Sequence, residues 1–187
     1  MNDSTWEYEL TKPDPADFPR AFEGFFAQHH RSFLRYAGSR LRNRQDAEDA
    51  VQEAAVKIYR KWERIMAHQN PRAMAYQILL HTLIDFYRKR TRMAVLDEAA
   101  RREAPSVADF GELGDHAVLD TALDELEKTA PLQARSVRLR HLTDLSYEDV
   151  ALCLDITPGA ARTNTSLGLA KLRTLMSDIP DAGKGDS

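Results

Sequence analysis

Polar and basic side chains gather between Thr157 and Arg173 at a spacing suited to contact with DNA. An arginine can pair with guanine and an asparagine with adenine, while hydroxyl groups contact bases or phosphates. The side chains expected to face DNA from a helix in this stretch are Thr157, Arg162, Thr163, Asn164, Ser166 and Lys171. The alternative is a plain helical hairpin with an incidentally polar face.

A tight pair of helices would position this set. Ser146 is a good N-cap, and Asp149 three residues later resembles the partner residue of a capping box. Thr157 and Pro158 then supply a second N-cap and the first residue of the next helix. Asp155 stands at the turn, where a left-handed backbone is wanted and aspartate tolerates it. Helices joined this closely form the unit whose second helix can enter a major groove.

A second polar group is acidic and lies on a helix expected from Gln45 to Arg64. Asp46, Asp49, Gln52 and Glu53 fall mostly off its apolar stripe, so they are surface groups. Acids in a first turn complement the helix dipole, but that does not account for the two residues on the following turn. Because an acidic surface repels phosphate, this face is expected to meet something other than DNA.

A third group is basic. Pro71 is placed to open a helix that runs to about Arg92. Four of the five residues from 88 to 92 are Arg or Lys, which exceeds what favourable interaction with a helix C-terminus requires.

The net charge of −3 hides an uneven distribution. Residues 94–119 carry six acidic and two basic side chains, whereas residues 128–176 carry seven basic and four acidic ones. A chain so mildly charged is expected to bind DNA weakly by itself, because phosphate neutralisation supplies most of the non-specific affinity.

The spacing of apolar residues predicts an all-α fold, since spacings of three and four recur and strand-like alternation never persists. Periodicity is lost from Met93 to Leu119, which predicts a flexible linker between two small helical domains. The expected organisation is an N-terminal extension (1–20), a helical bundle (21–93), a linker (94–118), a helix-turn-helix domain (119–177) and a flexible tail (178–187).

Several classes of protein are disfavoured. No apolar run approaches the roughly 18 residues of a membrane span, so no membrane insertion is expected. The N-terminus carries acidic residues where a signal peptide carries basic ones, so a cytoplasmic location is expected. No phosphate-binding glycine loop, HExxH motif or nucleophile elbow is present, so no catalytic residue, metal or cofactor is expected. Cys153, Tyr59 and Trp62 lie on or near apolar stripes and are expected to be buried.

Three motifs together carry a family resemblance. They are DAEDAVQEAAVKIYRKW (46–62), NPRAMAYQILLHTLIDFYRKR (70–90) and YEDVALCLDITPGAARTNTSLGLAKLR (147–173). They resemble region 2.2, the helix that follows it, and region 4.2 of sigma-70 family sigma factors of the extracytoplasmic-function group. The resemblance covers roughly Phe22 to Met176.

The resemblance implies a role for each polar group. The acidic helix would dock on the β′ clamp helices of core RNA polymerase, through Asp49, Gln52 and Glu53 together with Asp46. The set implied for the single-stranded −10 element is Lys61, Arg64, His68, Asn70, Gln77, His81, Arg88, Lys89 and Arg90. The helix-turn-helix would read the −35 element.

The function implied is that of an alternative sigma factor, which binds core polymerase, recognises and opens promoters, and starts transcription under control of an anti-sigma factor. Several positions depart from the family pattern. The family often has Asn at the position of His81, Arg at that of Leu167 and Thr-Val at those of Ala160-Ala161. The changes at Leu167 and at Ala160-Ala161 could weaken −35 binding. The alternative function is a stand-alone helix-turn-helix regulator, which would leave the acidic helix without a role. An enzyme is the third and least favoured class.

Overall fold

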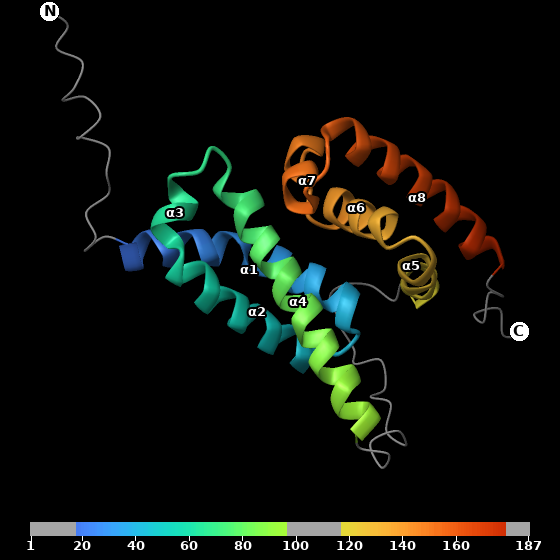
Figure 1. Ribbon diagram of the computed structural model, residues 1–187, viewed down its shortest axis with the longest axis horizontal. Helices are drawn as coiled ribbons and strands as arrows, with labels where there is room; N and C mark the ends of the chain where they lie inside the picture. The colour runs from blue at the N-terminus through green and yellow to red at the C-terminus, as the bar shows by residue number, and fades with distance from the viewer. Residues whose placement is uncertain (1–17, 97–116, 179–187) are drawn as a thin grey trace, which may run out of the picture.

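The computed structural model describes residues 18–96 and 117–178, and every regular element within these ranges is a helix (Figure 1). The helices are α1 (Phe18–Leu41), α2 (Arg44–Arg60), α3 (Trp62–Met66), α4 (Pro71–Leu96), α5 (Ala117–Thr129), α6 (Pro131–Leu142), α7 (Tyr147–Leu154) and α8 (Pro158–Asp178). The all-α prediction is confirmed. Among the described residues, no helix is long and apolar enough to cross a membrane.

Helices α1 to α4 form one bundle, built around aromatic side chains. Phe33, Tyr36 and Tyr76 are fully buried, and the Phe33 and Tyr76 rings meet edge to face with centroids 4.8 Å apart. Trp62 is buried as expected, with its ring 5.1 Å from that of Phe25. Aromatic pairs of this kind add stabilisation beyond the area that they bury.

Two helix boundaries differ from the expected ones. The helix expected to run to Arg64 is interrupted at Lys61, whose backbone (φ −111°, ψ 14°) ends α2 and precedes α3. Helix α4 begins at Pro71 as expected but continues to Leu96. Most of the expected N-terminal extension, linker and tail lie outside the described residues.

Helices α5, α6 and α8 pack around a second core that includes Leu123, Leu126 and Leu172. Helices α6 and α8 approach each other closely at Gly168. A Cβ atom there would lie 2.7 Å from Val137 Cγ2 and 3.0 Å from the backbone oxygen of Gln133. The absence of a side chain therefore lets α8 pack tightly on α6, which fixes the face of α8 turned to solvent.

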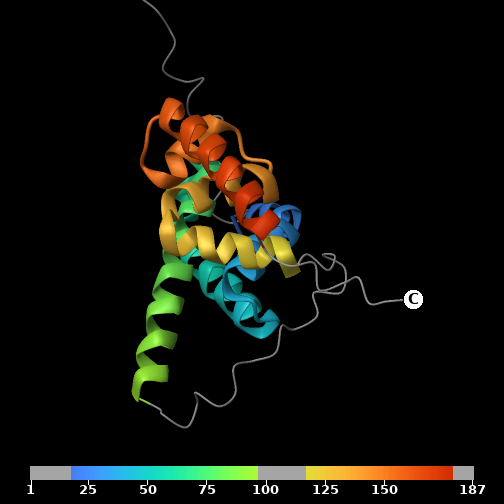
Figure 2. The same ribbon diagram turned by 90° about the vertical axis from the view of Figure 1, so that its right-hand side faces the viewer.

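The two bundles are packed against each other. The larger core continues from α4 into α7, where Val150 and Cys153 are buried together with Ala73 and Leu79 of α4. Figures 1 and 2 show α6 and α7 lying between α4 and α8. The buried thiol expected at Cys153 is confirmed.

Candidate functional site

The acidic face of α2 is formed as the sequence predicts. Asn43 caps the helix by accepting a hydrogen bond from the Asp46 backbone N–H at 2.9 Å. Asp49 and Gln52 are exposed, and Glu53 is half-buried. Lys57 Nζ lies 2.8 Å from Glu53 Oε1, and this hydrogen bond lowers the pKa of Glu53. The opposite face is buried, so these side chains are directed away from the core.

Apolar side chains extend this acidic face toward the C-terminal end of α2. Val56 is 51% exposed and Tyr59 is 46% exposed. The burial expected for Tyr59 is therefore wrong. Its ring packs against that of Phe22, with centroids 5.1 Å apart and an angle of 68° between the ring planes. The surface of α2 thus combines carboxylates, an amide and apolar groups, a mixture that suits contact with another protein.

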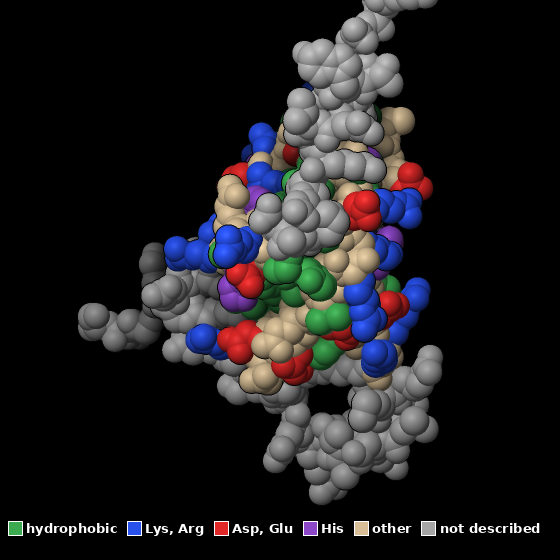
Figure 3. All heavy atoms as spheres, turned by 90° about the vertical axis from the view of Figure 1, so that its left-hand side faces the viewer, with side chains coloured by type: hydrophobic (Ala, Val, Ile, Leu, Met, Phe, Trp, Pro, Cys, Tyr) green, Lys and Arg blue, Asp and Glu red, His purple; other side chains and the backbone are tan. Residues whose placement is uncertain are grey.

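The stretch between α2 and α4 carries the first part of the candidate strand-binding set. Lys61 and Arg64 are exposed. His68 Nδ1 accepts the Asn70 backbone N–H at 3.0 Å, and Asn70 Oδ1 accepts the Ala73 N–H at 2.9 Å, which caps α4. On the end of the molecule that carries α3, a group of hydrophobic side chains is exposed among Lys, Arg and His side chains and several acidic ones (Figure 3).

Helix α4 carries the rest of that set. Gln77, His81 and Arg88 are spaced by four and seven residues, so they line one strip of the helix over about 16 Å. His81, Arg88 and Lys89 are exposed, while Gln77 is half-buried. The side chain of Arg90 lies outside the described residues. The strip begins at Gln77, within two turns of the residue at which α4 starts.

The helix-turn-helix is formed by α7 and α8. Ser146 and Asp149 form a complete capping box, and Asp155 ends α7 with a left-handed backbone (φ 55°, ψ 49°), as the sequence predicts. Thr157 Oγ1 accepts the Ala160 N–H at 3.2 Å and so caps α8. These local interactions fix the angle at which the second helix leaves the first.

The solvent face of α8 holds most of the expected DNA-contacting side chains. The exposed members are Thr157, Arg162, Thr163, Ser166 and Lys171. Asn164 is half-buried, and its Nδ2 donates a hydrogen bond to the Ala160 carbonyl at 2.8 Å, so part of its amide is already engaged. Leu167 is 49% exposed on the same face.

A cationic cluster beside α8 was not predicted. The guanidinium groups of Arg140 and Arg162 lie over the Tyr147 ring, 5.1 Å and 5.0 Å from its centroid. Arg140 also donates to the Leu145 carbonyl at 2.9 Å, which fixes it beside the start of α7. Arginines held this way suit phosphate contacts. The helical periodicity of the sequence places Tyr147 on an apolar face. It does not predict the cluster, because the three residues come from α6, α7 and α8.

No group of three His, Cys, Asp or Glu side chains in the described ranges is arranged to hold a metal ion. The geometry instead defines a protein with two cationic surfaces suited to nucleic acid and a separate acidic surface on α2.

Comparison with known proteins finds related sigma factors. The family description Sigma-70 region 2 matches residues 25–93. RNA polymerase sigma factor SigV of Bacillus subtilis is 32% identical over 126 residues, which cover 66% of this chain and 71% of that protein. RNA polymerase sigma-E factor of Streptomyces avermitilis is 27% identical over 152 residues, covering 81% and 83% respectively.

Two solved structures share the fold. The sigma factor RpoE of Bartonella quintana, in complex with the anti-sigma factor NepR, aligns with a TM-score of 0.65 at 20% identity, covering 85% of this chain and 98% of that one. CnrH, in complex with the cytosolic domain of CnrY, aligns with a TM-score of 0.61 at 23% identity, covering 86% and 91%.

This chain belongs to the sigma-70 family of RNA polymerase sigma factors, in the extracytoplasmic-function group. Its function is that of an alternative sigma factor that directs transcription initiation. Sigma factors are regulatory subunits without enzymatic activity of their own.

Proposed function

We propose that this chain docks on the β′ clamp helices of core RNA polymerase through the face of α2 that carries Asp46, Asp49, Gln52 and Glu53. The observation that supports this most directly is the exposure of an acidic, partly apolar surface on a helix whose other face is fully buried. A carboxylate surface would repel phosphate and attract a basic protein surface. Polymerase would then supply the DNA affinity that the chain's net charge of −3 does not provide.

The surface formed by the α2–α4 stretch and the α4 strip would bind the separated −10 strand. Its cations, amides and imidazoles would follow the backbone of a single strand and hold bases that have left the stack. Promoter opening needs no catalytic group, since strand binding can offset the unstacking cost of a few kcal/mol per base. The chain would therefore act by binding alone, without enzymatic activity.

The α7–α8 unit would read the −35 element, with the exposed side chains of α8 directed into the major groove. Arg140, held over the Tyr147 ring beside Arg162, would contact the phosphates at the edge of the same groove, while Arg162 reaches the bases. Phosphate contacts of this kind would fix the register in which α8 meets the bases.

Replacing Arg162 with Ala tests this assignment. We expect transcription from a −35-dependent promoter to fall about 5- to 150-fold, because one good base contact contributes about 1–3 kcal/mol. On a template whose −35 sequence is scrambled, the variant and the native chain should perform alike. Equal activity of both proteins on every intact promoter would show that α8 does not read DNA through this residue.

A regulatory partner is also proposed. One similar solved structure is a complex with the anti-sigma factor NepR and another is a complex with the cytosolic domain of CnrY, and this chain would be held by a partner of this kind in the cytoplasm. Co-purification from the native host tests this, and recovery only as free protein or with polymerase would contradict it.

A further inference from the structure

A cleft lies where the end of α1 and the second half of α4 meet α5 and the start of α6. Its volume is about 770 Å³, and sites for small molecules in proteins commonly span about 300–1,000 Å³. The cleft is therefore large enough for a ligand of nucleotide size, and the chemistry of its walls indicates which class of ligand it suits.

The lining of the cleft is rich in positive charge. Five of its side chains are cationic and only two, Asp124 and Glu127, are carboxylates. The chain as a whole carries a net charge of −3, so this excess of positive charge is local. A cleft lined by one sign of charge concentrates small ions of the opposite sign. The ligand that it favours is an anion. The cationic side chains are Arg40, Arg42, Arg88, Lys128 and Arg135.

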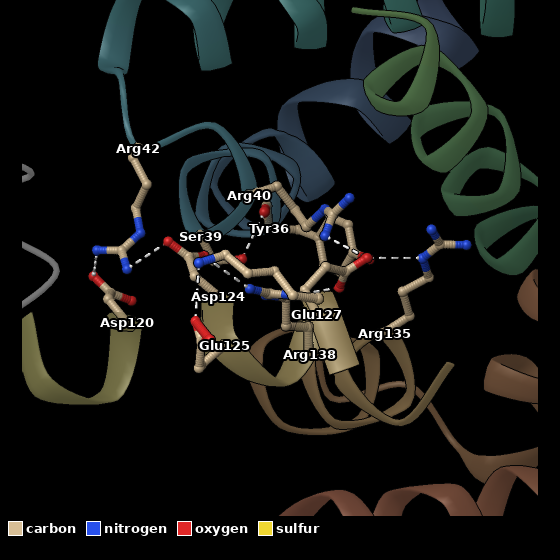
Figure 4. A network of polar contacts seen from close by, with 11 residues as sticks. Tyr36, Ser39, Arg40, Arg42, Asp120, Asp124, Glu125, Glu127, Arg135 and Arg138 are labelled. Atoms are coloured by element: carbon tan, nitrogen blue, oxygen red, sulfur yellow. Dashed lines mark hydrogen bonds and ion pairs between the residues drawn. The ribbon is translucent and has the colours of Figure 1, made fainter. Parts of the chain in front are cut away.

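Ion pairs within the protein do not balance this charge, because one carboxylate serves several arginines (Figure 4). Arg40 lies 2.6 Å from the Glu127 carboxylate, and Arg135 lies 3.2 Å from it. The fully buried Arg138 lies 2.7 Å from the same group. A single negative charge cannot neutralise three guanidinium groups. Positive charge therefore remains at the cleft even though each of these arginines has a partner.

Hydrogen-bond donors also remain for a ligand. Arg135 reaches Glu127 through its Nε, and its two terminal nitrogens are directed away from the network (Figure 4). Arg88 is exposed and forms no ion pair within the described parts of the chain. Lys128 is exposed and gives one of its three donors to Glu125 at 2.9 Å. Guanidinium and ammonium groups of this kind bind phosphate oxygens.

An aromatic ring stands at the same cleft. Tyr87 of α4 is 58% exposed, although it lies among the lining residues. Its phenol is close to the Lys128 ammonium. The hydrogen bond from Glu125 chiefly raises the pKa of Lys128, and Tyr87 raises that pKa further. Bases of any type stack on an exposed ring beside a cationic surface. The remaining lining is apolar and consists of Leu41, Ile84 and Pro131.

We propose that this cleft binds a nucleoside triphosphate, with the phosphates between Lys128 and Arg135 and the base stacked on Tyr87. Phosphate alone would leave the ring unused, and a base alone would leave the positive charge unbalanced. A triphosphate concentrates several negative charges on one short chain, which matches cations gathered around one small volume. The site goes beyond the proposed function. Of the residues assigned above to polymerase or DNA, it uses only Arg88, which would contact the same phosphates.

Titration of the full chain with nucleotides tests the site directly. ATP, GTP, CTP and UTP are each titrated by calorimetry at low ionic strength, beside tripolyphosphate and adenosine. At least one triphosphate should bind with one site per chain. Tripolyphosphate should bind at least about fivefold more weakly, because it lacks the stacked base, and adenosine should not bind measurably. No saturable binding of any triphosphate, or equal affinity for tripolyphosphate, would overturn the proposal.

Two exposed side chains separate the base contact from the phosphate contact. Tyr87→Ala should weaken triphosphate binding at least about fivefold and leave tripolyphosphate binding unchanged. Tyr87→Phe keeps the ring and should retain the native affinity. Lys128→Gln should weaken the binding of both ligands. Arg60→Gln removes an equal charge from an exposed position on α2 and should change neither affinity. Equal losses for both ligands in Tyr87→Ala, or no loss in Lys128→Gln, would contradict the assignment.

A short mixed-sequence single strand distinguishes the two sources of a base and a phosphate. A strand that binds more tightly than every triphosphate, and loses the same factor in Tyr87→Ala, would assign the cleft to nucleic acid and overturn the proposal. If a variant loses its helical circular dichroism, the comparison of ligands on the native chain decides the question.

The outcome is separate from that of the proposed function. A chain that starts transcription with polymerase but binds no triphosphate would contradict only the site proposed here. A chain that binds a triphosphate but forms no complex with polymerase would contradict only the proposed function.

Discussion

Reversing the charge of the α2 face, with Asp49→Lys and Glu53→Lys together, should abolish association with core RNA polymerase. Losing close charge contacts at a protein interface and replacing them with repulsion should weaken binding at least about 100-fold. Folding should be almost unaffected, because Asp49 is exposed and Glu53 is half-buried with Lys57 as its partner. A new like-charge pair with Lys57 costs only about 0.2–0.5 kcal/mol. Affinity can be measured by fluorescence anisotropy and folding by circular dichroism.

A matched control changes the same charge elsewhere. Glu23→Lys with Asp85→Lys alters two exposed acids on α1 and α4 and should retain polymerase binding. If the α2 variant keeps native circular dichroism and native affinity, the polymerase-binding surface lies elsewhere on the chain.

Replacing Glu127 with Ala should produce a large loss of stability. This carboxylate pairs with Arg40, Arg135 and Arg138, and the Arg138 guanidinium, 2.7 Å away, is fully buried (Figure 4). Burial already lowers the pKa of Arg138, which reflects the cost of keeping its charge away from water. Removing one partner of a buried ion pair costs about 3–5 kcal/mol. For a chain of this size we expect the melting temperature to fall by about 6–20 °C in a thermal scan.

Two further variants distinguish loss of the pair from loss of the side chain. Glu125→Ala removes an exposed carboxylate two residues away and should shift the melting temperature little. Arg138→Met together with Glu127→Ala removes the fully buried charge along with its partner. Part of the stability should return, because only Arg40, at 14% exposure, and the more exposed Arg135 are then left without that carboxylate. A melting temperature as low for this double variant as for Glu127→Ala would contradict the electrostatic explanation.

Features of the fold that depend on neighbouring residues could be predicted from the sequence. The capping box of Ser146 and Asp149 and the left-handed turn at Asp155 are specified within α7 and its ends. The buried stripe of α2 follows from helical periodicity, and the exposure of Asp49 and Gln52 follows from the same stripe. The assignment of these side chains to partners stays a prediction, supported by the resemblance and by their exposure.

Features that depend on contacts between distant residues could not be predicted. The exposure of Tyr59 depends on how much of its ring Phe22 covers, and these residues come from α2 and α1. The Arg140–Tyr147–Arg162 cluster requires the packing of three helices. Arg138 lies on a helix whose periodicity gives no sign that its guanidinium is buried, because its partners belong to α5. The packing of the two bundles could not be predicted either, because it too depends on contacts between residues far apart in the sequence.

The measurement that tests the central claim most directly is reconstitution of the full chain with bacterial core RNA polymerase. The mixture is examined first for a stable complex and then for transcripts from genomic DNA fragments. We expect a complex that starts transcription at discrete sites, and alignment of those sites should reveal a shared −10 and −35 sequence. A chain that forms no complex with polymerase but binds duplex DNA alone would contradict the assignment and favour a stand-alone helix-turn-helix regulator.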